Sequence, residues 1–265
     1  MIVLGYSLAL VMGLVLGLLG GGGSILTVPI LVYCFGFTAT VATGYSLLVV
    51  GLTSIFGAIK YYREKLIDFK VALLFAMPSM VGVLIARKFI VPSLPNTMHL
   101  FSYSISKDQL IMLAFAGLVL IISGFMLKAK DSETTPKTEA KPIKFKGLII
   151  AVEGFVVGGV TGFVGAGGGF MIVPALMLLS KVPLRKAIAT SLVIISLKSL
   201  TGFLGDLSEG MLIDWAFLAG FIGLTSIGVI IGTALNKKIP VHILRKGFAV
   251  FVVVMGLFIV IKELI

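Results

Sequence analysis

Ten apolar runs make up most of this 265-residue chain, and charged or turn-forming residues separate them. An α-helix needs about 20 apolar residues to cross the hydrocarbon core of a bilayer, and most of the runs come within a few residues of that length. The runs 24–35 and 170–180 are long enough for only about half a crossing. The pattern predicts an all-α polytopic membrane protein. In chain order the runs are 2–19, 24–35, 41–59, 71–86, 110–127, 147–164, 170–180, 187–205, 212–235 and 247–261.

The composition excludes the main alternatives to a membrane protein. Only 12% of the residues are charged and 58% are apolar, whereas a soluble domain has about 25% charged residues. A soluble globular protein and a disordered chain are therefore excluded. The net charge of +11 does not indicate a nucleic-acid partner, because the cations stand at the ends of apolar runs and form no basic face. We expect a multi-pass protein of the cell membrane, surrounded by the lipid bilayer.

The two halves of the chain resemble each other on either side of a polar segment with two prolines, 128–146. With Pro29 aligned to Pro174, Ser46 falls on Ser191, and glycine also falls on glycine at five positions of the preceding segment. Low complexity would align glycines by chance, but not proline and serine as well. We predict a first transmembrane repeat at 1–127, a solvated linker at 128–146 and a second repeat at 147–265.

The lysines and arginines indicate the orientation of the chain. If the linker is cytoplasmic and each long run crosses once, 17 of the 22 basic residues lie inside and four, Arg87 among them, lie outside, as the positive-inside rule expects. Each half then has a glycine-broken hairpin element that returns to its own side, followed by three transmembrane helices. The halves have opposite orientations, which is the inverted-repeat architecture of secondary transporters. The runs 2–19 and 147–164 are long enough to span, so the sequence leaves open whether each first element spans or is re-entrant.

Two glycine clusters, at 20–24 and 165–169, interrupt apolar runs at equivalent places. Irregular backbone is tolerated in a membrane only where protein or water surrounds it. The short helix after each cluster would direct free N–H groups and a positive dipole end at the break, and two such ends near the bilayer middle would bind an anion. Alternatively, the glycines only permit close helix packing, which is how we interpret Gly13, Gly17 and their repeat mates. The candidate substrate-binding residues of the clusters are Gly21, Gly22, Gly23, Ser24, Gly167, Gly168 and Gly169.

At these residues the sequence resembles the TauE/SafE family of membrane transporters, a group of sulfite exporters and sulfonate permeases. The similarity covers nearly the whole chain apart from the linker and the loop 91–108. It rests on the segments GLLGGGGSILTVPIL and TGFVGAGGGFMIVPALMLL, on ATGYSLL and AIATSLV, and on LIDF and LIDW. The family pattern Thr-Ser-Leu is present at Thr190 and Ser191, whereas the first repeat has Tyr45 before Ser46. The resemblance implies export or uptake of a small sulfur-containing anion such as sulfite, a sulfonate or thiosulfate.

Besides Asp214, which stands at the start of its run, two charged residues lie within the apolar runs. Lys198 is about 18 Å along a helix from the cytoplasmic Lys186, and a lysine at that depth should face the protein interior. It either attracts the anion as a fixed positive charge or has a structural role as an ion-pair or snorkelling residue. Glu153 either pairs with Lys198, or carries a coupling proton, or reaches solvent at the interface.

Several polar side chains have both a functional and a structural interpretation. Ser46, Thr190 and Ser191 could donate hydrogen bonds to an oxyanion, or they could bond backbone carbonyls of their own helices. Asp68 and Asp214 begin apolar runs, and we expect them to cap helices.

The sequence contains no pattern typical of catalysis or of a bound cofactor. His99 and His242 are solitary, and the single Cys34 excludes an intrachain disulfide and a cysteine-based metal site. We therefore expect neither an enzyme, a metal site nor a cofactor. The sequence predicts a secondary transporter of a small inorganic or organosulfur anion that works by alternating access, with proton coupling as an option. The alternative is a passive anion channel, which would share the site but show no saturable exchange.

Overall fold

The protein was analysed as a computed structural model, which describes residues 2–95, 97–100, 103–128, 146–165, 167–178, 182–236 and 238–264. The predicted linker, 128–146, lies outside these residues apart from its two end residues. The regular secondary structure of the described part is helical except for one antiparallel hairpin, in which Thr97 pairs with Ser106 and Leu100 with Tyr103. The elements are α1 (Ile2–Leu19), α2 (Ser24–Tyr33), α3 (Ala39–Arg63), α4 (Phe69–Ile85), η1 (Ala86–Ile90), α5 (Val91–Ser93), β1 (Thr97–Leu100), β2 (Tyr103–Ser106), α6 (Lys107–Lys128), α7 (Lys146–Val164), α8 (Gly169–Leu178), α9 (Leu184–Ser208), α10 (Trp215–Asn236) and α11 (Val241–Leu264).

Each of the ten apolar runs forms a helix, because a chain in lipid must satisfy its backbone hydrogen bonds within the segment. The predicted caps are confirmed. The Asp68 carboxylate accepts a hydrogen bond from the backbone N–H of Val71 at 3.1 Å, and the Asp214 carboxylate accepts one from Phe217 at 3.0 Å. These caps fix the first turns of α4 and α10.

Within the described residues, six helices are long and apolar enough to cross a membrane, and the chain is a multi-pass membrane protein. The helices α2 and α8, each of 10 residues, are too short, as the lengths of their apolar runs predict. The six candidate spans are Ile2–Leu19, Ala39–Arg63, Phe69–Ser93, Gly147–Val164, Leu184–Ser208 and Trp215–Asn236.

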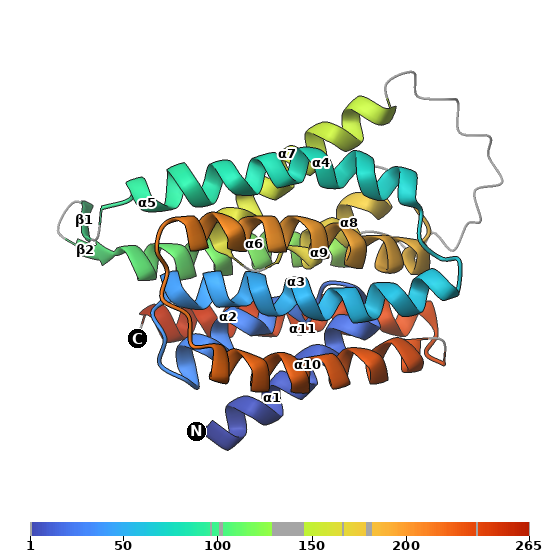
Figure 1. Ribbon diagram of the computed structural model, residues 1–265, viewed down its shortest axis with the longest axis horizontal. Coiled ribbons are helices and arrows are strands. Elements are labelled where there is room, and N and C mark those ends of the chain that lie inside the picture. Colours follow the sequence, from blue (N-terminus) through green and yellow to red (C-terminus); the bar gives the residue numbers. More distant parts are fainter. Residues whose placement is uncertain are drawn as a thin grey trace.

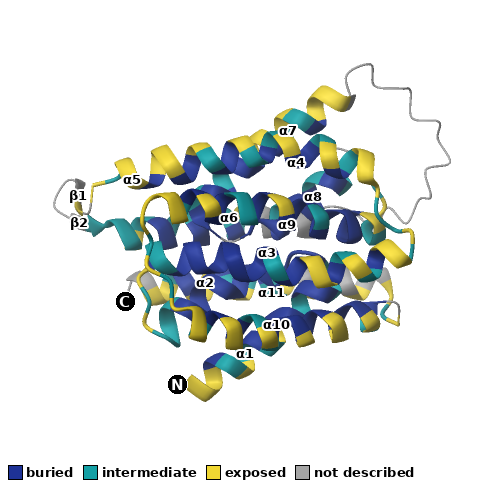
Figure 2. Ribbon diagram, viewed as in Figure 1, coloured by how far each residue is buried: buried dark blue, intermediate teal, exposed yellow. Residues whose placement is uncertain are grey.

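The helices lie roughly side by side in one bundle, with α3 and α9 in its interior (Figures 1 and 2). The two chain ends lie at the same end of the bundle as β1 and β2, and the loop from α3 to α4 lies at the opposite end (Figure 1). We call the end of the bundle that holds β1 and β2 the hairpin end. The helix α1 packs on α10, α4 packs on α7, and α3 packs on α9.

The paired glycines outside the two clusters serve helix packing, as predicted. A Cβ atom on Gly13 would overlap the backbone of Thr225, and one on Gly17 would overlap the backbone of Val229. These contacts let α1 and α10 approach closely. Gly158 and Gly162, which align with Gly13 and Gly17 in the sequence, lie against α4 in the same way, at Ser79 and Val83.

Two features differ from the sequence-based expectation. The loop before α6 contains the hairpin β1–β2, which the apolar pattern does not indicate. In addition, α4 does not end with its apolar run but continues through the π-helical turn η1 into α5. Arg87, which the charge count places outside the membrane, lies in η1 and has only 1% of its side chain exposed. The π turn carries the chain on past Ala86 and directs this arginine into the bundle.

Candidate functional site

The two glycine clusters break the chain between α1 and α2 and between α7 and α8, and the breaks touch each other. A Cβ atom on Gly21 would overlap the backbone of Gly169, and one on Gly169 would overlap the Cα of Gly21. All described residues of 20–24 and 165–169 are buried. Gly20 (φ +69°) and Gly165 (φ +70°) adopt the left-handed conformation that ends α1 and α7. The sequence therefore brings two turns from distant segments into contact inside the bundle.

The N-terminal ends of α2 and α8 lie at this contact. The first turn of α2 is formed by hydrogen bonds from Ser24 N to Gly21 O (3.1 Å) and from Leu26 N to Gly23 O (3.0 Å). No acceptor among the described residues is recorded for the N–H groups of Gly21, Gly22 and Gly23. The Ser24 hydroxyl donates to Gly21 O at 2.6 Å and is thus used locally. The first break therefore presents backbone donors at the positive end of a helix.

Lys198 is buried beside the second break. Its side chain, on α9, is 1% exposed, and its ammonium donates a hydrogen bond to the hydroxyl of Thr161 on α7. A Cβ atom on Gly168 would lie 2.5 Å from the Lys198 nitrogen, so the cation adjoins the break directly. Within the described part of the chain no ion pair joins Lys198 to Glu153, which is half-buried on α7. Thr161, which sequence reasoning did not single out, is the partner instead.

The three hydroxyl candidates have different surroundings. The Ser191 hydroxyl donates to Gly20 O at 2.7 Å and to Ile188 O at 2.8 Å, so it contacts the first break. The Ser46 hydroxyl is buried and has no hydrogen-bond partner among the described residues. The Thr190 hydroxyl accepts a hydrogen bond from the backbone N–H of Asp68 at 3.1 Å. Thr190 therefore contacts the loop between α3 and α4 and does not approach the breaks through its hydroxyl.

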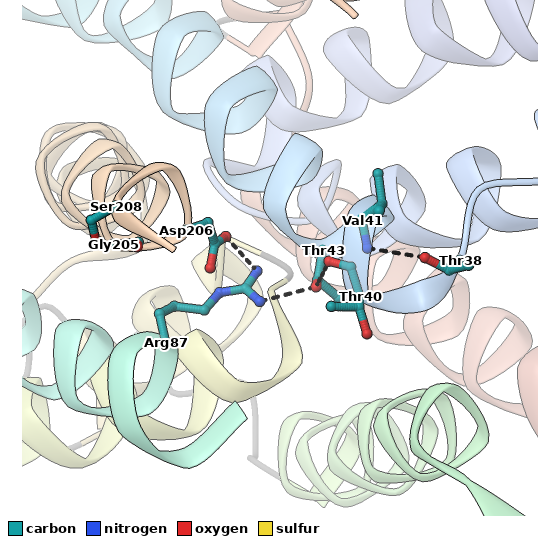
Figure 3. Close-up of polar contacts among 8 residues, drawn as sticks. All are labelled: Thr38, Thr40, Val41, Thr43, Arg87, Gly205, Asp206 and Ser208. Atoms are coloured by element: carbon teal, nitrogen blue, oxygen red, sulfur yellow. Dashed lines mark hydrogen bonds and ion pairs between the residues drawn. The ribbon is translucent and has the colours of Figure 1, made fainter. Parts of the chain in front are cut away.

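An ion pair near the second break was missed by the sequence reasoning (Figure 3). Arg87 Nη2 lies 3.4 Å from Asp206 Oδ2, and Arg87 Nη1 donates to Thr43 Oγ1 at 3.0 Å. Thr43 in turn contacts the second break, since a Cβ atom on Gly165 would overlap its side chain. Sequence reasoning considered only Glu153 and Lys198 as charged groups of the apolar runs, and it did not consider this pair, although both of its partners lie within candidate spans. The available signal was that each partner directly follows an apolar run, 71–86 or 187–205.

Together these groups are suited to holding a small oxyanion. They comprise backbone N–H groups with no acceptor among the described residues, helix N-termini and one buried ammonium, all of which favour negative charge, whereas no recorded contact places the Ser46 hydroxyl at either break. Among the described residues, no group of three His, Cys, Asp or Glu side chains is arranged to hold a metal ion. The side chains of His99 and His242 lie outside the described part of the structure.

Comparisons with known proteins identify membrane transporters as relatives of the chain. The family model described as "Sulfite exporter TauE/SafE" matches residues 6–259. The chain is 29% identical over 260 residues to the probable membrane transporter protein YunE of Bacillus subtilis. The matched region covers 94% of this chain and 93% of the relative. It is 28% identical over 254 residues to a probable membrane transporter protein of Xylella fastidiosa, with 94% and 90% covered. No solved structure matches the chain.

Proposed function

The chain belongs to the TauE/SafE family of membrane transporters, and from this premise we propose that it moves a small sulfur-containing anion across the cell membrane by alternating access. The transported anion is of the sulfite, sulfonate or thiosulfate class. The protein is a transporter and not an enzyme. The observation that carries the proposal is the buried contact between Gly21 and Gly169, which joins the two helix breaks.

The proposed anion site is the space around this contact. An oxyanion there would accept hydrogen bonds from the N–H groups of 21–23 and 167–169 and would lie at the positive ends of α2 and α8. Such interactions are strong inside a membrane protein, where little water screens them. Lys198 contributes the fixed positive charge, and Ser46 offers a free hydroxyl. Ser191 contributes through its contact with Gly20, and Thr190 contributes only by positioning α9 through the loop at Asp68.

The proposed mechanism requires two inverted repeats, 1–127 and 147–265, joined by a cytoplasmic linker at 128–146. Equivalent packing contacts support this division. Gly13 contacts Thr225 where α1 packs on α10, and their repeat mates Gly158 and Ser79 make the same contact where α7 packs on α4. Each contact joins one repeat to the other. Alternating access by rocking of one repeat against the other requires such an interface. In the proposed orientation the hairpin end is external.

Proton coupling is a further part of the proposal. Glu153 is the candidate, because it is a half-buried carboxyl on α7, the helix that leads into the second break. An anion carried with a proton moves less net charge through the membrane, which lowers the electrostatic cost of transport.

The test is counterflow in proteoliposomes loaded with unlabelled sulfite. A transporter will accumulate labelled sulfite transiently, with saturation, and external thiosulfate or a sulfonate will compete if it shares the site. A passive channel will equilibrate sulfite without counterflow, and that result would contradict alternating access. Thermal stabilisation of the purified protein by sulfite, thiosulfate, sulfonates and sulfate will rank the substrates.

A further inference from the structure

The buried guanidinium of Arg87 has more hydrogen-bond donors than the structure uses. An arginine presents five N–H donors, but the contacts recorded for Arg87 are one hydrogen bond to Thr43 and the ion pair with Asp206. Its Nε and Nη2 atoms are buried and make no hydrogen bond to any described residue. The 3.4 Å separation from Asp206 is longer than the roughly 2.7–2.9 Å of a well-formed charge-assisted bond. The guanidinium can therefore accept a better-placed anion.

A chain of contacts joins Arg87 to the second break. The Thr43 hydroxyl accepts a hydrogen bond from Arg87, and the Thr43 side chain contacts Gly165. Asp206 is 12% exposed, whereas Arg87 is 1% exposed, so the carboxylate is the partner nearer the surface. The same network continues to Asp108 on α6, which accepts hydrogen bonds from the backbone and the hydroxyl of Thr40 at 3.0 Å.

The local backbone presents Arg87 inward. It lies in the π-helical turn η1, and its neighbours Lys88 and Phe89 are exposed. Single π turns inside α-helices are frequent at functional sites. In the second repeat, α10 continues as a regular α-helix past Thr233, the repeat mate of Arg87.

The Arg87–Asp206 pair has no counterpart at the aligned positions of the other half of the chain, Thr233 and Tyr61, which are both uncharged. The repeat mate of Asp206 is Tyr61, whose hydroxyl donates to the backbone carbonyl of Gly17 at 3.1 Å. Tyr61 therefore makes a hydrogen bond between neutral groups at the position that aligns with Asp206. The two aligned positions therefore make chemically different contacts.

From these observations we propose that Arg87 is an anion-binding residue on the external path and that Asp206 occupies its guanidinium in the closed state. This inference rests on the proposed function and its orientation. An incoming oxyanion replaces the Asp206 carboxylate on Arg87, so the buried positive charge stays compensated throughout. The freed Asp206 turns to water, which opens the contact between α9 and η1. The substrate class is a small oxyanion able to form a bidentate pair with a guanidinium.

A double-variant cycle in oriented proteoliposomes tests this assignment. Asp206→Asn removes the competing carboxylate, so the external half-saturation concentration for sulfite should fall at least about fivefold, within the usual range of coupling between groups. Arg87→Gln, alone or combined with Asp206→Asn, should raise the external half-saturation concentration for sulfite by at least the same factor. Lys88→Gln is the matched control, because it removes an exposed charge next to Arg87. It should leave the half-saturation concentration unchanged. If Asp206→Asn and the double variant behave alike, the guanidinium does not bind the anion and the proposal is overturned.

A second measurement does not depend on transport. In a Cys34→Ser background, Val50→Cys places a thiol against Gly167, inward of Arg87. An impermeant thiol reagent added outside should label this cysteine several-fold faster in Asp206→Asn than in the unaltered protein. Equal labelling rates would overturn the role of Asp206 in closure.

The two proposals fail in different ways. Saturable sulfite counterflow with no difference among the variants would retain the proposed function and reject the role of Arg87. Arg87-dependent thermal stabilisation by sulfite, in a protein that catalyses no transport, would support the role of Arg87 and reject the proposed function.

Discussion

Gly21 and Gly169 meet backbone to backbone, which brings the first turns of α2 and α8 into contact although 148 positions separate the two residues in the chain. A side chain on either residue would overlap the main chain of the other. Backbone cannot move aside as a flexible side chain can, so the contact requires glycine at both positions. The geometry holds two helix N-termini together in the interior of the bundle, where their unpaired donors favour a bound anion.

Replacing either glycine by alanine should therefore separate the two breaks. We expect Gly21→Ala and Gly169→Ala to lower the free energy of unfolding by about 1–3 kcal/mol each, as overpacking does, and to weaken sulfite binding. The thermal midpoint of the detergent-solubilised protein and its shift with sulfite measure both effects. Gly223→Ala is the control, because Gly223 is an exposed helical residue with no atom within 4 Å of its Cβ position. If Gly21→Ala is as harmless as this control, the contact is not required.

Removing the charge of Lys198 should weaken anion binding without unfolding the protein. Methionine is similar in length and apolar, so Lys198→Met should fit the buried site, while the loss of a charged donor should reduce sulfite affinity about tenfold or more. Thermal stabilisation as a function of sulfite concentration gives the affinity. Lys88→Met is the control, because Lys88 is exposed, and it should leave the sulfite affinity unchanged. An unaltered affinity in Lys198→Met would remove this lysine from the site.

The helices could be predicted from the sequence because lipid imposes a simple rule. A segment such as 24–35 is apolar and too short to cross, and α2 forms there with 10 residues. The caps at Asp68 and Asp214 can also be predicted from the sequence, because a carboxylate before an apolar run satisfies the first free N–H groups of the helix. These features depend on neighbouring residues only.

The candidate site could be predicted only in part. A glycine cluster in the sequence indicates where a helix is broken. The contact of Gly21 with Gly169, however, depends on how distant segments pack. Arg87 was placed outside because a charge at the end of an apolar run normally reaches water; its burial depends on the π turn and on Asp206, more than 100 positions away. Thr161 as the partner of Lys198 is likewise a tertiary contact.

Neutralising Glu153 should separate coupling from transport. If this carboxyl carries the coupling proton, Glu153→Gln should abolish sulfite accumulation driven by a pH gradient while sparing sulfite exchange, because exchange requires no net proton movement. Uptake with and without an imposed gradient, in the same proteoliposomes, measures the two activities. Asp68→Asn changes a carboxyl that caps α4 outside the breaks, and it should keep gradient-driven accumulation. Accumulation that survives in Glu153→Gln would refute the coupling role.

Breaking the buried pair of Arg87 and Asp206 should cost more stability than removing both charges. Arg87→Met leaves an uncompensated carboxylate and Asp206→Leu leaves an uncompensated guanidinium, and each should destabilise the protein by about 3–5 kcal/mol. The double variant has no unpaired charge at this place, so it should recover most of that loss. The thermal midpoints of the three variants in detergent, compared with Lys88→Met as the exposed control, measure the coupling. A double variant whose loss equals the sum of the single losses would show that the two charges do not compensate each other in the folded protein.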